Sequence, residues 1–184
     1  MARWGGGPGN ITGRGDARSV CGLKDLCEWI GRKDVRVVVE VGVYAGDATM
    51  IFAQYWQDAM IYAVDPWLRG YDPHAVASRN DQRPVEELFD QHVRHFPNIT
   101  KVKKKSVDAA KTFVGRGVDV VYIDGCHQYE AVVEDIAAWR KKTRLVVCGH
   151  DYNGPGWPGV GKAVRSAFGE PHKVFEDTSW AVRL

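Results

Sequence analysis

The chain has 184 residues, of which 45% are hydrophobic, and its formal net charge is +2. This length supports one domain with a sizeable core, and the composition excludes a disordered or fibrous chain. The charge is too small to indicate nucleic-acid binding, and no apolar run reaches the ~18 residues that a membrane helix needs. The sequence therefore predicts a single globular domain that does not cross a membrane.

The cysteines indicate the redox compartment. Cys21, Cys27, Cys126 and Cys148 form neither a Cys-x-x-Cys pair nor a secretory disulfide framework, and the N-terminus has no signal-peptide core. We therefore expect a cytoplasmic protein whose cysteines are reduced.

A stretch rich in glycine and arginine opens the chain, and regular alternation follows it. Residues 1–19 lack apolar periodicity, which predicts a flexible N-terminal arm ahead of a domain over residues 20–184. Apolar residues then recur at helical spacing over residues 22–32. The β-branched run at residues 35–42 is typical of a strand buried on both faces, and residues 60–65 are predicted to form a second buried strand. Further strands are predicted at residues 98–103, 118–124 and 144–151. Helical spacing predicts further helices at residues 47–57, 85–96, 106–114, 128–142 and 160–168.

The order of these elements predicts the fold. Strands that alternate with helices form parallel βαβ units, which predicts an α/β fold with a doubly wound sheet. A hairpin over residues 172–184 completes the chain. Open parallel sheets bind ligands at the carboxyl ends of their strands. Asp65, Asp124, His150 and Asp151 lie at the carboxyl ends of predicted strands, so we expect them at that edge of the sheet.

The loop after the first strand, "EVGVYAG" at residues 40–46, has the features of a ligand-binding turn. Gly42 and Gly46 allow a tight turn and a close backbone approach to a ligand. A dinucleotide site would show Gly-x-Gly-x-x-Gly instead, and the acidic Glu40 disfavours a pyrophosphate. Asp65 follows about twenty residues after the glycines, where a carboxylate usually binds ribose hydroxyls. The alternative for Asp65 is an ordinary turn residue at a strand end.

Four segments together resemble the small class I S-adenosylmethionine-dependent methyltransferases: "VVVEVGVYAGDAT", "YAVDPW", "VDVVYIDGCHQYEAVVEDIAAW" and "LVVCGHDY". The likeness is greatest to the branch of metal-assisted sugar and antibiotic O-methyltransferases and cephalosporin-hydroxylase-like proteins, and it covers residues 35–184. The resemblance implies a single-domain, Rossmann-like fold whose mostly parallel, seven-stranded sheet has an antiparallel C-terminal strand. It also implies S-adenosylmethionine as the cofactor.

The resemblance implies the binding residues as well. Those expected to bind the methionine part, the ribose or the adenine of the cofactor are Glu40, Gly42, Tyr44, Gly46, Asp65, Ser106 and Asp124. It further implies a divalent metal, Mg²⁺ or Mn²⁺, with Asp124, His150 and Asp151 as candidate ligands. One imidazole with two carboxylates suits Mn²⁺ better than Mg²⁺, which prefers an all-oxygen site.

Catalytic roles are expected for Asp124 and His127. A metal would lower the pKa of an acceptor hydroxyl, and His127 or Asp124 would then take its proton. The alternative for His127 is a helix-capping residue that orients Asp124. Trp157 and the polar segment from Trp67 to Arg79 are expected to frame the acceptor, although Trp157 in a Gly/Pro loop is equally explained as a packing lid.

These expectations give metal-assisted O-methylation of a small molecule or sugar as the predicted function. Because no substrate domain is appended, the acceptor is either small or partly enclosed by a second subunit in a homodimer. Three alternatives stay open: an iron oxygenase that uses His127, His150 and an aspartate, a non-catalytic S-adenosylmethionine-binding module, and an RNA acceptor bound by the basic runs at residues 101–105 and 140–144. Zinc bound through Cys126 and Cys148 is a weaker possibility, because buried cysteines are usually structural.

Overall fold

The computed structural model describes residues 17–154 and 156–184, so residues 1–16 of the predicted N-terminal arm lie outside the described part. The strands are β1 (Val37–Val41), β2 (Met60–Val64), β3 (Ile99–Val102), β4 (Val118–Ile123), β5 (Thr143–Gly149), β6 (Lys173–Val174) and β7 (Trp180–Arg183). The helices are α1 (Ala17–Ile30), α2 (Asp47–Tyr55), α3 (Arg83–Val93), α4 (Ser106–Ala110), α5 (Tyr129–Arg140) and α6 (Pro158–Phe168), with a 3₁₀ turn at Val76–Arg79.

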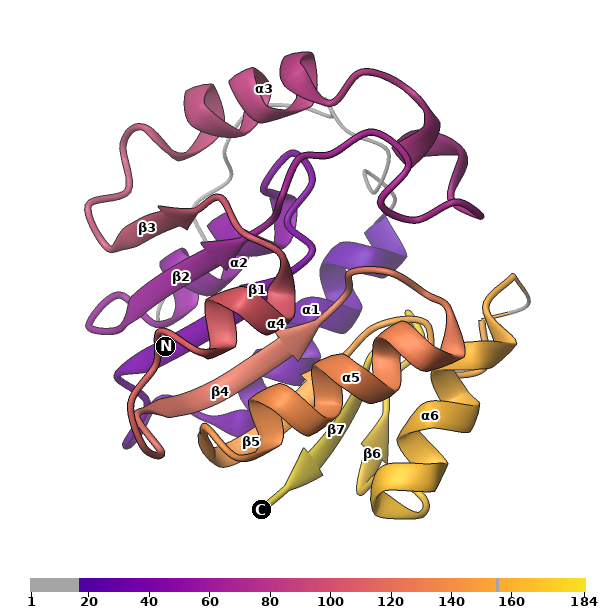
Figure 1. Cartoon of the computed structure of the whole chain (residues 1–184). Helices are drawn as coiled ribbons and strands as arrows, with labels where there is room; N and C mark the ends of the chain where they lie inside the picture. Colours follow the sequence, from indigo (N-terminus) through magenta and orange to yellow (C-terminus); the bar gives the residue numbers. More distant parts are fainter. Residues whose placement is uncertain (1–16, 155) are drawn as a thin grey trace.

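The strands form one sheet in the order β3-β2-β1-β4-β5-β7-β6 (Figure 1). Strands β1 to β5 pair in parallel, and β7 runs antiparallel to both β5 and β6. The predicted α/β sheet, mostly parallel with an antiparallel C-terminal strand, is therefore confirmed. The strand order reverses between β1 and β4, and this is the point where open α/β sheets bind their ligands.

Helices cover both faces of the sheet because alternate strand residues point to opposite sides (Figure 1). Val38 packs with residues of α1 and α2, among them Phe52. Its neighbour Val39 packs on the other side with residues of α5 and α6, among them Trp139. All six residues of the central strand β4 are buried, and four of them are β-branched, which is typical of a strand covered on both faces.

Three elements differ from the sequence prediction. Helix α1 begins at Ala17, within the expected arm, and ends before Gly31, whose φ of 87° is left-handed. Helix α4 ends at Ala110 rather than near residue 114, because the Thr112 hydroxyl donates to the Ala109 carbonyl and so competes with the helical pattern. Strand β6 has only two residues. Among the described residues, no helix is both long and apolar enough to cross a membrane.

Candidate active site

A cavity of about 320 Å³ opens at the carboxyl ends of β1, β2 and β4, at the point where the strand order reverses. Six of the seven residues expected to bind the cofactor line this cavity: Glu40, Gly42, Tyr44, Asp65, Ser106 and Asp124. The seventh, Gly46, is the N-cap of α2, and a Cβ there would meet Phe89 at 2.8 Å. The fold thus brings together predicted residues from four separate segments of the chain.

Gly42 allows the first loop to pass close to the end of β4. Its φ of 83° is left-handed, and a Cβ at this position would stand 2.1 Å from the carbonyl oxygen of Asp124. Only glycine satisfies both constraints. Tyr44, in the same loop, also adopts a left-handed conformation with φ 53°, and its side chain is half-exposed at the cavity.

Asp65 connects this loop to the end of β2. Its Oδ2 accepts hydrogen bonds from the backbone N–H groups of Val43 (2.9 Å) and Tyr44 (3.0 Å), and its Oδ1 accepts one from Trp67 (2.7 Å). Burial raises the pKa of Asp65, and these three N–H groups oppose the rise. A carboxylate oxygen has two lone pairs, so Oδ1 retains acceptor capacity for a ligand hydroxyl. The residue therefore shapes the loop in addition to facing the cavity.

Polar side chains buried around the cavity have partners. Glu40 accepts a hydrogen bond from the Thr49 hydroxyl at 2.5 Å. The Ser106 hydroxyl oxygen accepts a hydrogen bond from the indole N–H of Trp139 at 2.9 Å. Ser106 also hydrogen-bonds to Asp135 on α5, whose pKa burial raises to about 7. This role of Asp135 could not be predicted from the sequence, because an acidic residue on a helix is usually exposed.

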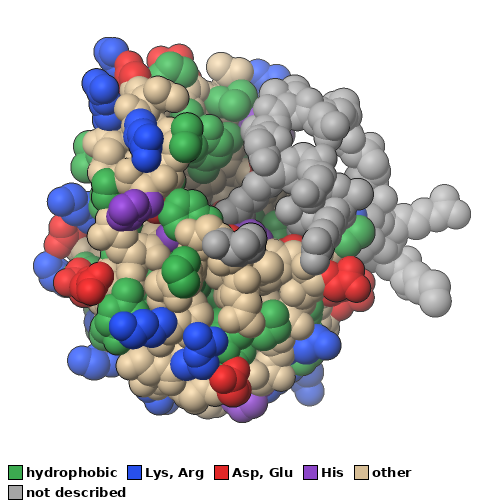
Figure 2. Space-filling view, turned by 90° about the vertical axis from the view of Figure 1, so that its right-hand side faces the viewer, with side chains coloured by type: hydrophobic (Ala, Val, Ile, Leu, Met, Phe, Trp, Pro, Cys, Tyr) green, Lys and Arg blue, Asp and Glu red, His purple; other side chains and the backbone are tan. Residues whose placement is uncertain are grey.

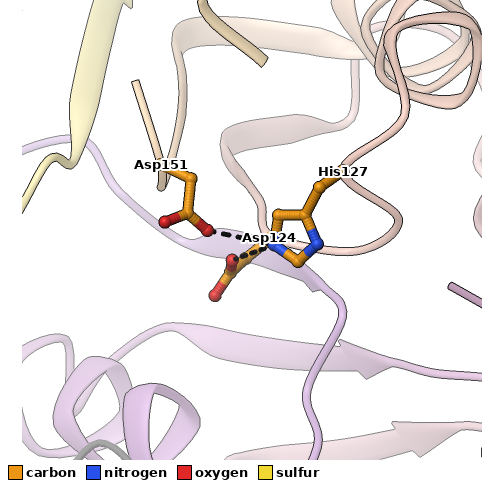
Figure 3. Close-up of side chains that lie close together, drawn as sticks. All are labelled: Asp124, His127 and Asp151. Carbon is orange, nitrogen blue, oxygen red and sulfur yellow. Dashed lines mark ion pairs between the residues drawn. The ribbon is translucent and has the colours of Figure 1, made fainter. Parts of the chain in front are cut away.

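Beside the cavity, three carboxylates surround one imidazole, and we call Asp72, Asp124, Asp151 and His127 the His127 cluster. The ring Nε2 of His127 lies 3.0 Å from Asp151 Oδ2 and 3.7 Å from Asp124 Oδ1 (Figure 3). Its Nδ1 lies 2.6 Å from Asp72 Oδ2. Burial alone would lower the pKa of His127, but the carboxylates outweigh it and raise the pKa to about 11. The carboxylates therefore favour a positive charge at Nε2, which either a proton or a metal ion can supply.

Three members of the His127 cluster form a group of possible metal ligands, and this group differs from the expected metal site in one residue. Among the described residues, the ligand atoms that lie within 4.8 Å of one another belong to Asp124, His127 and Asp151. The structure thus joins Asp124 and Asp151 as expected, with His127 in the place expected for His150. The His150 ring contacts Asp151 (Nδ1 to Oδ2, 3.3 Å) and lies 3.9 Å from Asp177 Oδ2, on the side of the C-terminal hairpin.

The alternative metal chemistries receive less support from this geometry. The group of potential ligands contains one histidine and no cysteine among the described residues, whereas the iron alternative needs His127 and His150 together. Cys148 is fully buried, its thiol donates to the Val121 carbonyl, and burial raises its pKa. A thiol held in this way is not a zinc ligand, because zinc binds the thiolate.

Among the residues expected to frame the acceptor, some line the cavity and others are packed behind its wall. The indole ring of Trp157 stacks on His127, with ring centroids 4.2 Å apart and an interplanar angle of 23°. Trp67 is buried, and its indole N–H donates to the Tyr44 carbonyl. Tyr71 lines the cavity. Trp157 is thus part of the wall behind His127.

The basic run at residues 101–105 is partly neutralised. Lys101 forms ion pairs with Glu86 (2.9 Å) and Asp90 (2.8 Å), and Lys103 pairs with Glu86 at 2.6 Å. On the face shown in Figure 2, basic and acidic side chains are interspersed over the visible surface. These pairs weaken the argument for an RNA acceptor that rested on this run.

The strand order, the antiparallel C-terminal strand and the cavity at the switch point are those of the class I S-adenosylmethionine-dependent methyltransferase fold. A family model described as a methyltransferase domain matches residues 39–152, which is more than half of the chain. The protein therefore belongs to this methyltransferase family, as its sequence resemblance implied. No curated protein matches the sequence significantly.

Solved structures with the same fold are distant in sequence. A putative caffeoyl-CoA O-methyltransferase from Staphylococcus aureus is 14% identical, with a TM-score of 0.62 over 95% of this chain and 84% of that one. A SAM-dependent methyltransferase from Aquifex aeolicus is also 14% identical, with a TM-score of 0.59 over 88% and 87%. A cofactor-bound protein from MTB is 18% identical, with a TM-score of 0.60 over 88% and 78%. At these identities the likeness concerns the fold.

Proposed function

We propose that the protein is an S-adenosylmethionine-dependent O-methyltransferase that uses a divalent metal to methylate a hydroxyl group of a small molecule or sugar. One observation carries this proposal: Asp124 and His127 line the cofactor-type cavity and also belong to the His127 cluster. A methyl donor in the cavity and an acceptor at the cluster would therefore be neighbours, as direct transfer requires.

The cavity supplies groups suited to each part of S-adenosylmethionine. The carboxylate of Asp65 is the proposed acceptor for the ribose hydroxyls, and the buried Ser106, which lines the cavity, is the residue proposed to adjoin the adenine. Glu40, Gly42 and Tyr44 would surround the methionine part. The sulfonium centre already carries the methyl group in reactive form, so the protein has to align donor and acceptor and help the acceptor lose its proton.

Asp124, His127 and Asp151 are the residues proposed to hold the metal. The carboxylates around His127 attract positive charge strongly enough to raise its pKa to about 11, and a divalent cation would meet the same demand. The set of one imidazole and two carboxylates suits Mn²⁺. When bound, such a metal would act as a Lewis acid that lowers the pKa of the acceptor hydroxyl. Asp124, at the boundary between cavity and cluster, is the residue proposed to hold the released proton.

The test is titration with Mn²⁺ by calorimetry on the wild type, Asp151→Ala and the control Asp58→Ala, whose side chain is exposed between α2 and β2. We expect Mn²⁺ to bind the wild type and the control and to bind Asp151→Ala at least about tenfold more weakly. Methyl transfer to a panel of catechols and sugars should show the same order. Turnover that is equal in all three proteins without added metal would contradict the metal-assisted mechanism. Cofactor binding without turnover on any acceptor would favour the non-catalytic module instead.

A further inference from the structure

The segment after β2, residues 66–82, forms one wall of the cavity and also reaches the His127 cluster. Its residues that line the cavity are Pro66, Leu68, Tyr71, Asp72, Ala75, Ala77, Ser78 and Gln82. Among them, Asp72 contacts His127, which lies 55 residues later in the chain. Asp72 is therefore the side chain by which this segment takes part in both the cavity and the cluster.

The hydrogen bonds of Asp72 require a carboxylate. Its side chain is buried, and Oδ1 accepts from the backbone N–H groups of His74 (3.0 Å) and Ala75 (3.3 Å). Its Oδ2 accepts from the backbone N–H of His127 (3.0 Å) and lies 2.6 Å from the ring Nδ1. Because each oxygen faces N–H donors, an amide in this place would turn its own NH₂ group toward a donor in either orientation.

Asp72 sets the direction in which the His127 ring points. A carboxylate only accepts hydrogen bonds, so Nδ1 carries a proton and donates to Asp72. The opposite nitrogen, Nε2, is thereby turned toward Asp151 and Asp124. Trp157 supports one face of the ring, so a hydrogen bond and a stacking contact fix both rotation and tilt.

We propose that Asp72 is a positioning residue, which acts through His127 to present Nε2 to Asp124 and Asp151 and links the wall of the cofactor cavity to the metal site. This inference rests on the proposed function, in which His127 is a metal ligand. Carboxylates that orient a ligating histidine usually change metal affinity 10–100-fold when they are replaced.

If Asp72 had only a structural role, its replacement would disturb only the turn in which its Oδ1 accepts from the N–H groups of His74 and Ala75. Asp72→Asn tests the difference, with Asp81→Asn as the matched control, because Asp81 belongs to the same segment and is exposed. A double-mutant cycle with His127→Ala then separates an effect transmitted by the imidazole from a general disturbance of the segment.

The first measurement needs no metal: a ¹⁵N-edited NMR spectrum of metal-free protein labelled at histidine. We expect a slowly exchanging, downfield imidazole N–H resonance that is absent in His127→Ala, lost or strongly shifted in Asp72→Asn and unchanged in Asp81→Asn. A resonance that persists unchanged in Asp72→Asn would overturn the inference. If Asp72→Asn does not fold, the wild-type spectrum still tests the inference. Absence of the downfield resonance in the wild type would contradict the hydrogen bond from His127 Nδ1 to Asp72.

The second measurement is Mn²⁺ affinity. We expect Asp72→Asn to weaken Mn²⁺ binding about 10–100-fold and to cause no further loss when His127 is already alanine. An equal loss in both backgrounds would show that Asp72 acts on the fold, and the inference would fail. If the wild type binds no Mn²⁺ while its His127 resonance depends on Asp72, the metal part of the proposed function fails and the positioning of His127 stands.

Discussion

Asp135 allows the burial beside the cavity to be tested quantitatively. Its side chain is 4% exposed, and burial raises its pKa from 3.8 to about 7, while the hydrogen bond with Ser106 opposes the rise. Because the pKa in the folded state is the higher one, the folded protein binds this proton more tightly than the unfolded chain does. The stability that this group contributes is therefore present at low pH and is lost as the pH rises from about 4 to about 7.

The separation of the two pKa values gives the magnitude. At ~1.4 kcal/mol for each pH unit, the interval from 3.8 to about 7 corresponds to about 4 kcal/mol. Asp135→Asn removes the titration while it nearly conserves the volume. We expect the stability of the variant relative to the wild type to rise by about 4 kcal/mol between about pH 4 and pH 8, because any cost of the new amide's hydrogen bonds does not depend on pH and cancels in this change.

The assay is urea unfolding followed by tryptophan fluorescence at several pH values in that range, with free energies from linear extrapolation. The difference between wild type and variant removes the contributions of all other titrating groups. Asp25→Asn, at an exposed position of α1, is the control for the replacement of a carboxylate by an amide at a solvated position. A flat difference for Asp135→Asn would refute the assignment of a buried carboxyl with a raised pKa.

Three further variants test separate parts of the structure. Gly42→Ala should abolish folding or cofactor binding, as measured by thermal melting and calorimetry. Gly31→Ala has an equally left-handed φ but open space around its Cβ, so it should lower the free energy of unfolding by only about 1–2 kcal/mol. Equal effects of the two variants would disprove the proposed clash at Gly42. Asp119→Ala removes the acceptor of the backbone N–H groups of Arg36 and Val37, so it should lower the free energy of unfolding in urea by about 2–4 kcal/mol. Cofactor affinity should not change. A loss of affinity would show that the distant end of the sheet controls the cavity. Trp157→Ala should weaken Mn²⁺ binding severalfold, because no aromatic ring then supports His127. Trp157→Phe should bind Mn²⁺ as the wild type does. Unchanged affinity in the alanine variant would show that stacking on His127 does not affect metal binding.

The sheet and the cavity could be predicted because the patterns that specify them are local. Runs rich in β-branched residues, such as residues 118–123, are typical of strands buried on both faces, and their alternation with helices leaves few topologies. Gly42 and Asp65 could be placed because each directly follows such a strand, so the position of the strand fixes the position of the residue.

The composition of the His127 cluster could not be predicted in full, because it depends on contacts between distant segments. His127 and His150 both follow central strands, and the sequence does not show which ring turns toward Asp124. In the structure, stacking on Trp157 holds His127 inward, while His150 lies between Asp151 and the C-terminal hairpin. Asp72 was missed because it belongs to a segment without strand or helix periodicity, where local sequence does not fix side-chain direction.

The central claim is that the cavity binds S-adenosylmethionine as a methyl donor. The most direct test is calorimetric titration of the wild type, Asp65→Ala and the control Asp58→Ala with S-adenosylmethionine and with its demethylated product, with and without Mn²⁺. The wild type and the control should bind both compounds, and Asp65→Ala should bind at least about tenfold more weakly, because three backbone N–H groups lose their acceptor, two of them in the loop after β1, and the ribose hydroxyls lose the acceptor proposed for them. Absence of binding to the wild type under every condition would contradict the assignment of the cavity and the methyltransferase function built on it.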